Sequence, residues 1–127
     1  MAEDVLVEED LNSASRLVDL LDVEGLNVRG TMWLYETDSE RWRFMICFRE
    51  KRENPTSFYR DMARVTNAHR ETETLSLDRV SVVPYDGSIF SRLSGVINVG
   101  GTTRLRMSHN RINGVYLEDA MIYRLEA

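Results

Sequence analysis

The sequence predicts an α+β fold in which three helices pack against about five, mostly antiparallel strands, in the order αββαβαββ. Two kinds of periodicity support this prediction, because apolar residues recur at helical spacing in some segments and alternate with polar residues in others. The 127 residues, 43% of them hydrophobic, are enough to build one hydrophobic core, so we expect residues 1–127 to form one domain. No apolar run approaches the roughly 20 residues that span a bilayer, which excludes a membrane-spanning helix.

The first helix is expected over roughly residues 8–24. Three acidic residues, Glu8 to Asp10, stand at its start, where the helix dipole favours negative charge, and Gly25 is placed to end it. Its apolar residues recur every three or four positions and predict one buried face: Leu11, Ala14, Leu17, Val18 and Leu21.

Two strands follow this helix and are expected to form an antiparallel hairpin. Side chains alternate in character from Val28 to Tyr35 and again from Arg41 to Arg49, and the polar residues 36–40 between them favour a short connection. One face should be almost wholly apolar and lie on the core. The opposite face should carry the residues with the richest binding chemistry: Arg29, Trp33, Tyr35, Arg41, Arg43 and Arg49.

A second helix is expected over roughly residues 55–70. Asn54 is suited to cap it and Pro55 to occupy its first turn. A short β-branched strand over residues 79–83 should follow, ended by Pro84.

The C-terminal part predicts a third helix and further strands. This helix opens after Asp86 and Gly87 and ends near Gly95. After residue 103, arginines alternate with less polar side chains, and the Asn113-Gly114 pair is typical of a hairpin turn. These features predict one or two hairpin strands, whose register the sequence leaves open.

Charge is segregated along the chain, although the total is −5. Residues 1–40 hold eleven acidic residues and two arginines, whereas residues 41–70 hold eight basic and three acidic residues. This pattern indicates either an acidic segment folded onto a basic surface or a basic face left for an anionic partner. We favour the first interpretation, because small domains usually neutralise their own fields over about 10 Å.

Residues suited to catalysis or metal binding are sparse. Cys47, His69 and His109 are not spaced as ligands of a structural zinc site, so we expect no metal, no cofactor and no catalytic residue. Cys47 lies in the middle of a strand, where a small, partly buried residue is usual. The glycine-rich residues 99–103 lack the lysine of a phosphate-binding loop.

Two stretches of the chain carry a resemblance to a family. The first is VRGTMWLY, from Val28 to Tyr35, with Trp42 following; the second is INGVYLEDAMIYRL, from Ile112 to Leu125. They resemble segments of a family of small uncharacterised bacterial proteins, over about half of the chain. The resemblance implies a bacterial α+β domain, and it brings neither an activity nor a catalytic residue.

The face with the arginines and aromatic residues has three interpretations. It can be covered by the rest of the chain or by a second copy, with arginine stems lying on the rings. It can bind a protein partner, since Trp, Tyr and Arg are the favoured anchors of interfaces. It can also bind nucleic acid, whose bases stack on aromatic rings while arginine contacts phosphate.

We therefore expect a non-enzymatic protein-interaction module in the cytoplasm, acting on a protein partner or a second copy through this face. The acidic start of the chain is unlike a secretory signal, and one cysteine cannot form an internal disulfide, which favours a reducing compartment. Two alternatives stay open. One is a nucleic-acid-associated protein; the other is a small hydrolase or nucleotide enzyme that uses His109 with Glu118 or Asp119.

Overall fold

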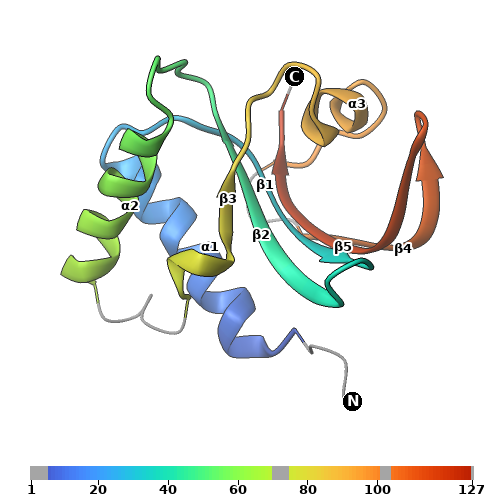
Figure 1. Ribbon diagram of the computed structural model, residues 1–127, viewed down its shortest axis with the longest axis horizontal. Helices are drawn as coiled ribbons and strands as arrows, with labels where there is room; N and C mark the ends of the chain where they lie inside the picture. The colour runs from blue at the N-terminus through green and yellow to red at the C-terminus, as the bar shows by residue number, and fades with distance from the viewer. Residues whose placement is uncertain (1–5, 70–74, 101–103, 127) are drawn as a thin grey trace.

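The described part of the chain folds into three α-helices and a five-stranded sheet in the predicted order αββαβαββ (Figure 1). The computed structural model describes residues 6–69, 75–100 and 104–126. Its elements are α1 (Glu8–Val23), β1 (Val28–Glu36), β2 (Arg41–Phe48), α2 (Thr56–Ala68), the 3₁₀ turn η2 (Leu77–Arg79), β3 (Val80–Val82), α3 (Ile89–Ser94), β4 (Leu105–Ile112) and β5 (Val115–Leu125). The predicted fold class is confirmed. Within these ranges, no helix is both long and apolar enough to cross a membrane.

The sheet has the strand order β3-β2-β1-β5-β4. The pairs β1–β2, β1–β5 and β4–β5 are antiparallel. Strand β3 runs parallel to β2, because α2 carries the chain back across the sheet between them. Consequently, β2 and β3 end at the same edge of the sheet, and this edge positions the candidate site.

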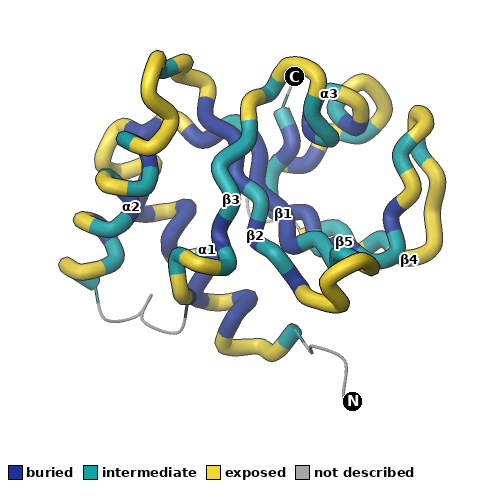
Figure 2. Tube along the Cα trace, viewed as in Figure 1, coloured by how far each residue is buried: buried dark blue, intermediate teal, exposed yellow. Residues whose placement is uncertain are grey.

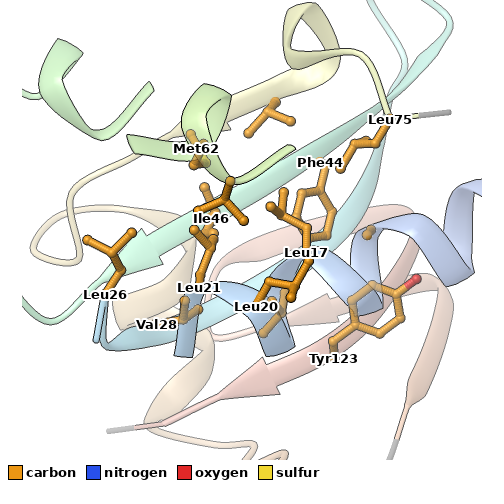
Figure 3. Packing of buried hydrophobic residues seen from close by; sticks show 14 of the residues in the cluster. Leu17, Leu20, Leu21, Leu26, Val28, Phe44, Ile46, Met62, Leu75 and Tyr123 are labelled. Carbon is orange, nitrogen blue, oxygen red and sulfur yellow. The ribbon is translucent and has the colours of Figure 1, made fainter. Parts of the chain in front are cut away.

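Helices cover both faces of the sheet. Helices α1 and α2 lie on one face, and α3 lies on the other, inside the curve of β5 and β4 (Figure 1). The first face holds a hydrophobic cluster that we call the helix-pair core, in which Leu17 of α1, Met62 of α2 and Phe44 of β2 meet (Figure 3). The second holds the α3 core, in which Phe90 and Leu93 pack with apolar residues of the sheet. Buried segments of the sheet therefore run between the helices on either side (Figure 2).

The hairpin of β1 and β2 forms as predicted, but its faces differ from the prediction. Trp33 lies opposite Phe44, whereas Arg43 lies opposite Leu34. Alternation defines two faces within each strand, but the register decides which face of β1 continues into which face of β2. The turn over residues 37–40 pairs Glu36 with Arg41, which places the aromatic residues of β1 on the helix-pair core. The expected face shared by aromatic residues and arginines is therefore wrong for Trp33, Tyr35, Arg41 and Arg43.

Two local signals mark the ends of elements. The Oδ1 atom of Asn54 accepts a hydrogen bond of 3.2 Å from the backbone N–H of Thr56, so Asn54 supports the start of α2 from one residue before the N-cap. Pro55 is the N-cap and not, as predicted, a residue of the first turn. Asn113 and Gly114 have φ angles of 47° and 80° and form the turn between β4 and β5. A two-residue turn with both φ angles positive matches the twist of antiparallel strands, which explains why this pair occurs here.

Candidate functional site

A cavity lies at the edge of the sheet where β2 and β3 both end. The loop after β2 leads to α2, the loop after β3 leads to α3, and a cavity of about 450 Å³ separates them. Ligand sites often lie at the carboxyl ends of parallel strands, and this volume is within the usual range of small-ligand sites. We call the cavity the cationic cleft. Four cations, two acids and seven apolar or aromatic residues line it: Arg29, Arg49, Lys51 and Arg52; Glu50 and Asp86; Phe48, Pro55, Phe58, Val82, Val83, Pro84 and Tyr85.

One wall of the cleft is an aromatic stack that carries Arg52. The rings of Phe48 and Phe58 are nearly parallel, with centroids 4.3 Å apart, and the guanidinium carbon of Arg52 lies 4.1 Å from the Phe58 centroid. Arg52 also forms ion pairs with Asp61 at 2.8 Å and Glu50 at 3.2 Å. Burial opposes its charge, but the hydrogen bonds to Asp61 and Glu50 outweigh burial and raise the pKa of Arg52 above its usual value. Arg52 is therefore a fixed positive charge.

A second guanidinium is fixed on the opposite wall. The guanidinium carbon of Arg29 lies 3.3 Å from the centroid of the Tyr85 ring, and its Nε donates to the backbone oxygen of Glu126 at 3.3 Å. The Tyr85 hydroxyl is hydrogen-bonded to the Ser94 hydroxyl of α3. Both partners of this cation–π pair are thus held by other elements, which orients them before any ligand arrives.

The mouth of the cleft carries two solvent-exposed ion pairs. Lys51 Nζ lies 3.2 Å from an Asp86 carboxylate oxygen, and the two side chains are 86% and 77% exposed. Arg49 forms a pair of 3.1 Å with Glu126. Exposed ion pairs contribute roughly 0–1 kcal/mol to folding stability. The carboxylate of a ligand can therefore replace Asp86 beside Lys51, or Glu126 beside Arg49, at a small cost in free energy.

The structure brings two of the six predicted binding residues together. Arg29 and Arg49 both line the cationic cleft. Trp33 is fully buried in the helix-pair core, 5.2 Å from Phe44 between ring centroids. Tyr35 packs edge-on against Trp42 and lies away from the cleft.

The two remaining predicted residues lie near the other end of β2. Arg43 donates to Glu36 of β1 at 3.3 Å and to the Ser81 hydroxyl of β3 at 2.9 Å, so it ties three strands together. Arg41 is exposed beside the β1–β2 turn.

The sequence also contains cleft residues that the prediction missed. Lys51 and Arg52 fall between the second strand and the second helix that the sequence predicts, and no local pattern in the sequence connects them with Phe58 or Tyr85. A signal was present, since a strand, a helix and a short strand in succession suggest a crossover whose strand ends share one edge. With that inference, the run Arg49–Arg52 and residues 83–86 would have been expected to meet.

The residues of the hydrolase alternative partly converge. His109 Nδ1 lies 3.2 Å from the Tyr116 hydroxyl and 3.8 Å from a Glu118 carboxylate oxygen. The cluster is on the surface of the β4–β5 hairpin, where the His109 side chain is 70% exposed. Asp119 is engaged by Arg106 and Ser108. Burial opposes ionisation of Asp119, but these hydrogen bonds outweigh it and lower its pKa below the usual value.

A second cavity, of about 400 Å³, adjoins this cluster at the β1–β2 turn. Its lining consists of residues 34–39 together with Tyr116 and Glu118, and His109 lies outside it. The candidate general base is therefore near a carboxylate without sharing a cavity with it.

The other candidate groups offer little chemistry. Cys47 is fully buried, and burial raises the pKa of its thiol to about 11, so the nucleophilic thiolate is scarce near neutral pH. Among residues 6–69, 75–100 and 104–126, no group of three or more His, Cys, Asp and Glu side chains is placed to hold a metal ion. Residues 101–103 of the glycine-rich stretch lie outside the described residues.

Comparisons of the chain with protein-family models, curated proteins and solved structures gave no match. The resemblance to small bacterial proteins stays a prediction, and the functional argument rests on the geometry of the cationic cleft.

Proposed function

We propose that this chain is a non-enzymatic protein-interaction module of the cytoplasm that binds an acidic segment of a protein partner in the cationic cleft. The observation that carries the proposal is the pair of guanidinium groups, Arg29 and Arg52, fixed on Tyr85 and Phe58 on the two walls of one cavity. Arginine and aromatic side chains are the residues most often found at the centres of protein interfaces. The proposal keeps the predicted kind of function and moves its surface from the sheet face to the cleft.

The charge of the cleft favours an acidic occupant. Its lining has four cations against two acids. Arg52 is held by Asp61 and Glu50, whereas Lys51 and Arg49 at the mouth form exposed ion pairs, with Asp86 and Glu126, that a ligand carboxylate can replace. Because Arg29 and Arg52 are already held by neighbouring groups, binding costs little side-chain entropy at these two positions. A ligand carboxylate near Arg49 and Lys51, with an apolar group on Phe58, would use both properties of the cavity.

A site-specific cross-linking experiment tests the proposal in living bacteria. The photoreactive amino acid p-benzoylphenylalanine replaces the exposed cleft residue Pro84 or, as a control, the exposed Asn67 of α2. We expect discrete protein adducts from position 84 and not from position 67. The double substitution Arg49→Glu and Lys51→Glu should reduce the yield about tenfold, which corresponds to about 1.4 kcal/mol of binding free energy.

The matched control is Arg60→Glu, which reverses an exposed charge on α2 outside the cleft and should leave the adducts unchanged. Adducts that nuclease treatment removes would favour the nucleic-acid alternative instead. Equal adducts from positions 84 and 67, or adducts that persist in the double variant, would reject the cleft as a protein-binding site. Circular dichroism of each variant verifies that the fold is retained.

A further inference from the structure

The β1–β2 turn is an acidic projection at the far end of the same hairpin. Residues 37–40 of the turn are all exposed (Figure 2), and Asp38 and Glu40 are their charged members. The neighbouring Glu36 is engaged by Arg43 at 3.3 Å. The lining of the adjacent cavity adds Glu118 to Glu36 and Asp38 and contains no Lys or Arg. Arg41, exposed beside the turn, and Arg43, paired with Glu36, offset part of this charge, but the four carboxylates Glu36, Asp38, Glu40 and Glu118 outnumber these two arginines.

The cationic cleft and this turn lie at opposite ends of β2, because Phe48, the last residue of the strand, lines the cleft and Arg41, the first, follows the turn. The strand has eight residues. At about 3.3 Å per residue, it separates the two features by about 25 Å. Because a rigid strand holds the two features this far apart, the turn of one molecule cannot enter the cleft of the same molecule. Two molecules arranged head to tail can do so.

The shapes of the two features also complement each other. The cleft is a concave cavity of about 450 Å³ between two loops, whereas the turn is a narrow, exposed projection. Asp38 and Glu40 would replace Asp86 and Glu126 as partners of Lys51 and Arg49, exchanging weak exposed ion pairs for ones between molecules. Charge complementarity of this kind fixes the orientation of partners and speeds their association.

We propose that the cationic cleft of one copy binds the acidic β1–β2 turn of a second copy. This inference rests on the proposed function and names the partner as another molecule of the same chain. The contact is heterologous, because the two surfaces differ, so each added copy presents a new cleft and a new turn. The contact area is small, so association is weak, reversible and sensitive to salt.

Sedimentation of the purified chain tests this assembly. At about 0.05 M NaCl we expect the average mass to rise above that of two chains as protein concentration approaches about 1 mM, and at about 0.5 M NaCl to return toward one chain. The cleft variant Arg49→Gln/Lys51→Gln and the turn variant Asp38→Asn/Glu40→Gln should each stay at the monomer mass of 14.7 kDa. Controls with Arg60→Gln or Asp19→Asn, exposed positions outside both features, should assemble like the original chain.

A mixture of the two variants gives the decisive result. The cleft variant retains its turn and the turn variant retains its cleft, so one interface remains and the mixture should stop at twice 14.7 kDa. Neutral substitutions are used so that the altered cleft and the altered turn do not attract each other. A chain that stays monomeric at all concentrations, or a mixture that does not dimerise, overturns self-docking. The cross-linking of heterologous proteins at position 84 is scored separately and can still support the proposed function.

Discussion

At the residue scale, Thr31 carries an unsatisfied polar group in the interior. The residue is fully buried on β1, and its hydroxyl has no hydrogen-bond partner among the described residues. A buried hydroxyl without a partner typically costs about 1–3 kcal/mol relative to a satisfied one. Its backbone partner across the hairpin is Ile46, a member of the helix-pair core, so an apolar side chain suits this position.

We predict that Thr31→Val raises the free energy of unfolding by about 1 kcal/mol, because valine has the same shape and lacks the hydroxyl. Urea denaturation followed by circular dichroism measures the change. The matched control is Thr66→Val, which removes a hydroxyl that donates to the Ala63 carbonyl at 3.1 Å and should not stabilise the protein. A less stable Thr31→Val variant would mean that this hydroxyl is satisfied in solution.

Sequence patterns predicted individual residues well where their neighbours are local. Leu17 and Leu21, expected on the buried face of the first helix, are fully buried. The residues of the cleft were harder to predict from the sequence, because the residues around them come from distant parts of the chain. Arg29 meets Tyr85, which follows it by more than fifty residues, and no local pattern encodes that contact. Arg49 was selected for its place on a strand, and its ion pair with Glu126 depends on the same long-range packing.

At the scale of the elements, the boundaries were predictable and the relation between strands was not. The second helix was expected over 55–70 and spans Thr56–Ala68, because its apolar stripe and its starting residues are local signals. Which side chains share a face of the hairpin depends instead on the pairing of Glu36 with Arg41. One residue more or less in the turn would shift this register and move the side chains of one strand to the other face. Trp33 was consequently expected on an outer face and lies in the core.

The contact between β1 and α3 gives a prediction for an element interface. A Cβ atom on Gly30 would lie 2.7 Å from Cδ1 of Phe90, which is fully buried. We predict that Gly30→Ala destabilises the fold by about 1–3 kcal/mol, the usual cost of overpacking a core. Thermal unfolding measures this change, and the smaller side chain in Gly30→Ala/Phe90→Leu should restore part of the loss.

The control is Gly95→Ala at the end of α3, where an added Cβ meets no atom within 4 Å. Its φ of −72° suits any residue, so this variant should unfold close to the original temperature. Equal stability of the Gly30→Ala variant would show that Phe90 shifts without cost and that β1 and α3 are less tightly packed.

At the scale of the whole molecule, acidic residues of the first segment pair with arginines of the same chain, as in the interpretation we favoured, but only some of these arginines belong to the basic segment of residues 41–70. Two pairs reach arginines outside the basic segment: Asp22 with Arg124 at 2.7 Å and Asp10 with Arg79 at 3.1 Å. Two further pairs join the acidic segment to the basic segment: Glu36 with Arg43 at 3.3 Å and Glu24 with Arg64 at 3.8 Å. Packing of α1 on the sheet decides the partners of Asp10 and Asp22, which linear charge counts do not reveal. Three basic residues of the basic segment, Arg49, Lys51 and Arg52, line the cationic cleft.

The two hydrophobic cores share one central sheet, and this predicts a single cooperative unfolding transition. Consecutive residues of β1 face opposite sides: Met32 belongs to the α3 core and Trp33 to the helix-pair core. Loss of the α3 core would therefore disturb the strand that carries Trp33. Both tryptophans, Trp33 and Trp42, lie in the helix-pair core, so their fluorescence reports on the side of the sheet remote from α3.

We predict that Leu93→Ala, a substitution in the α3 core, shifts the tryptophan unfolding transition and the circular-dichroism transition by the same amount. Leu93 is fully buried, and truncation of a buried leucine costs about 2–5 kcal/mol. Val96→Ala, at a side chain that is 64% exposed, is the matched control and should move neither transition. If fluorescence stays unchanged while circular dichroism shifts, the α3 core unfolds on its own. The cleft, whose Tyr85 is held by Ser94 of α3, would then open without unfolding of the helix-pair core.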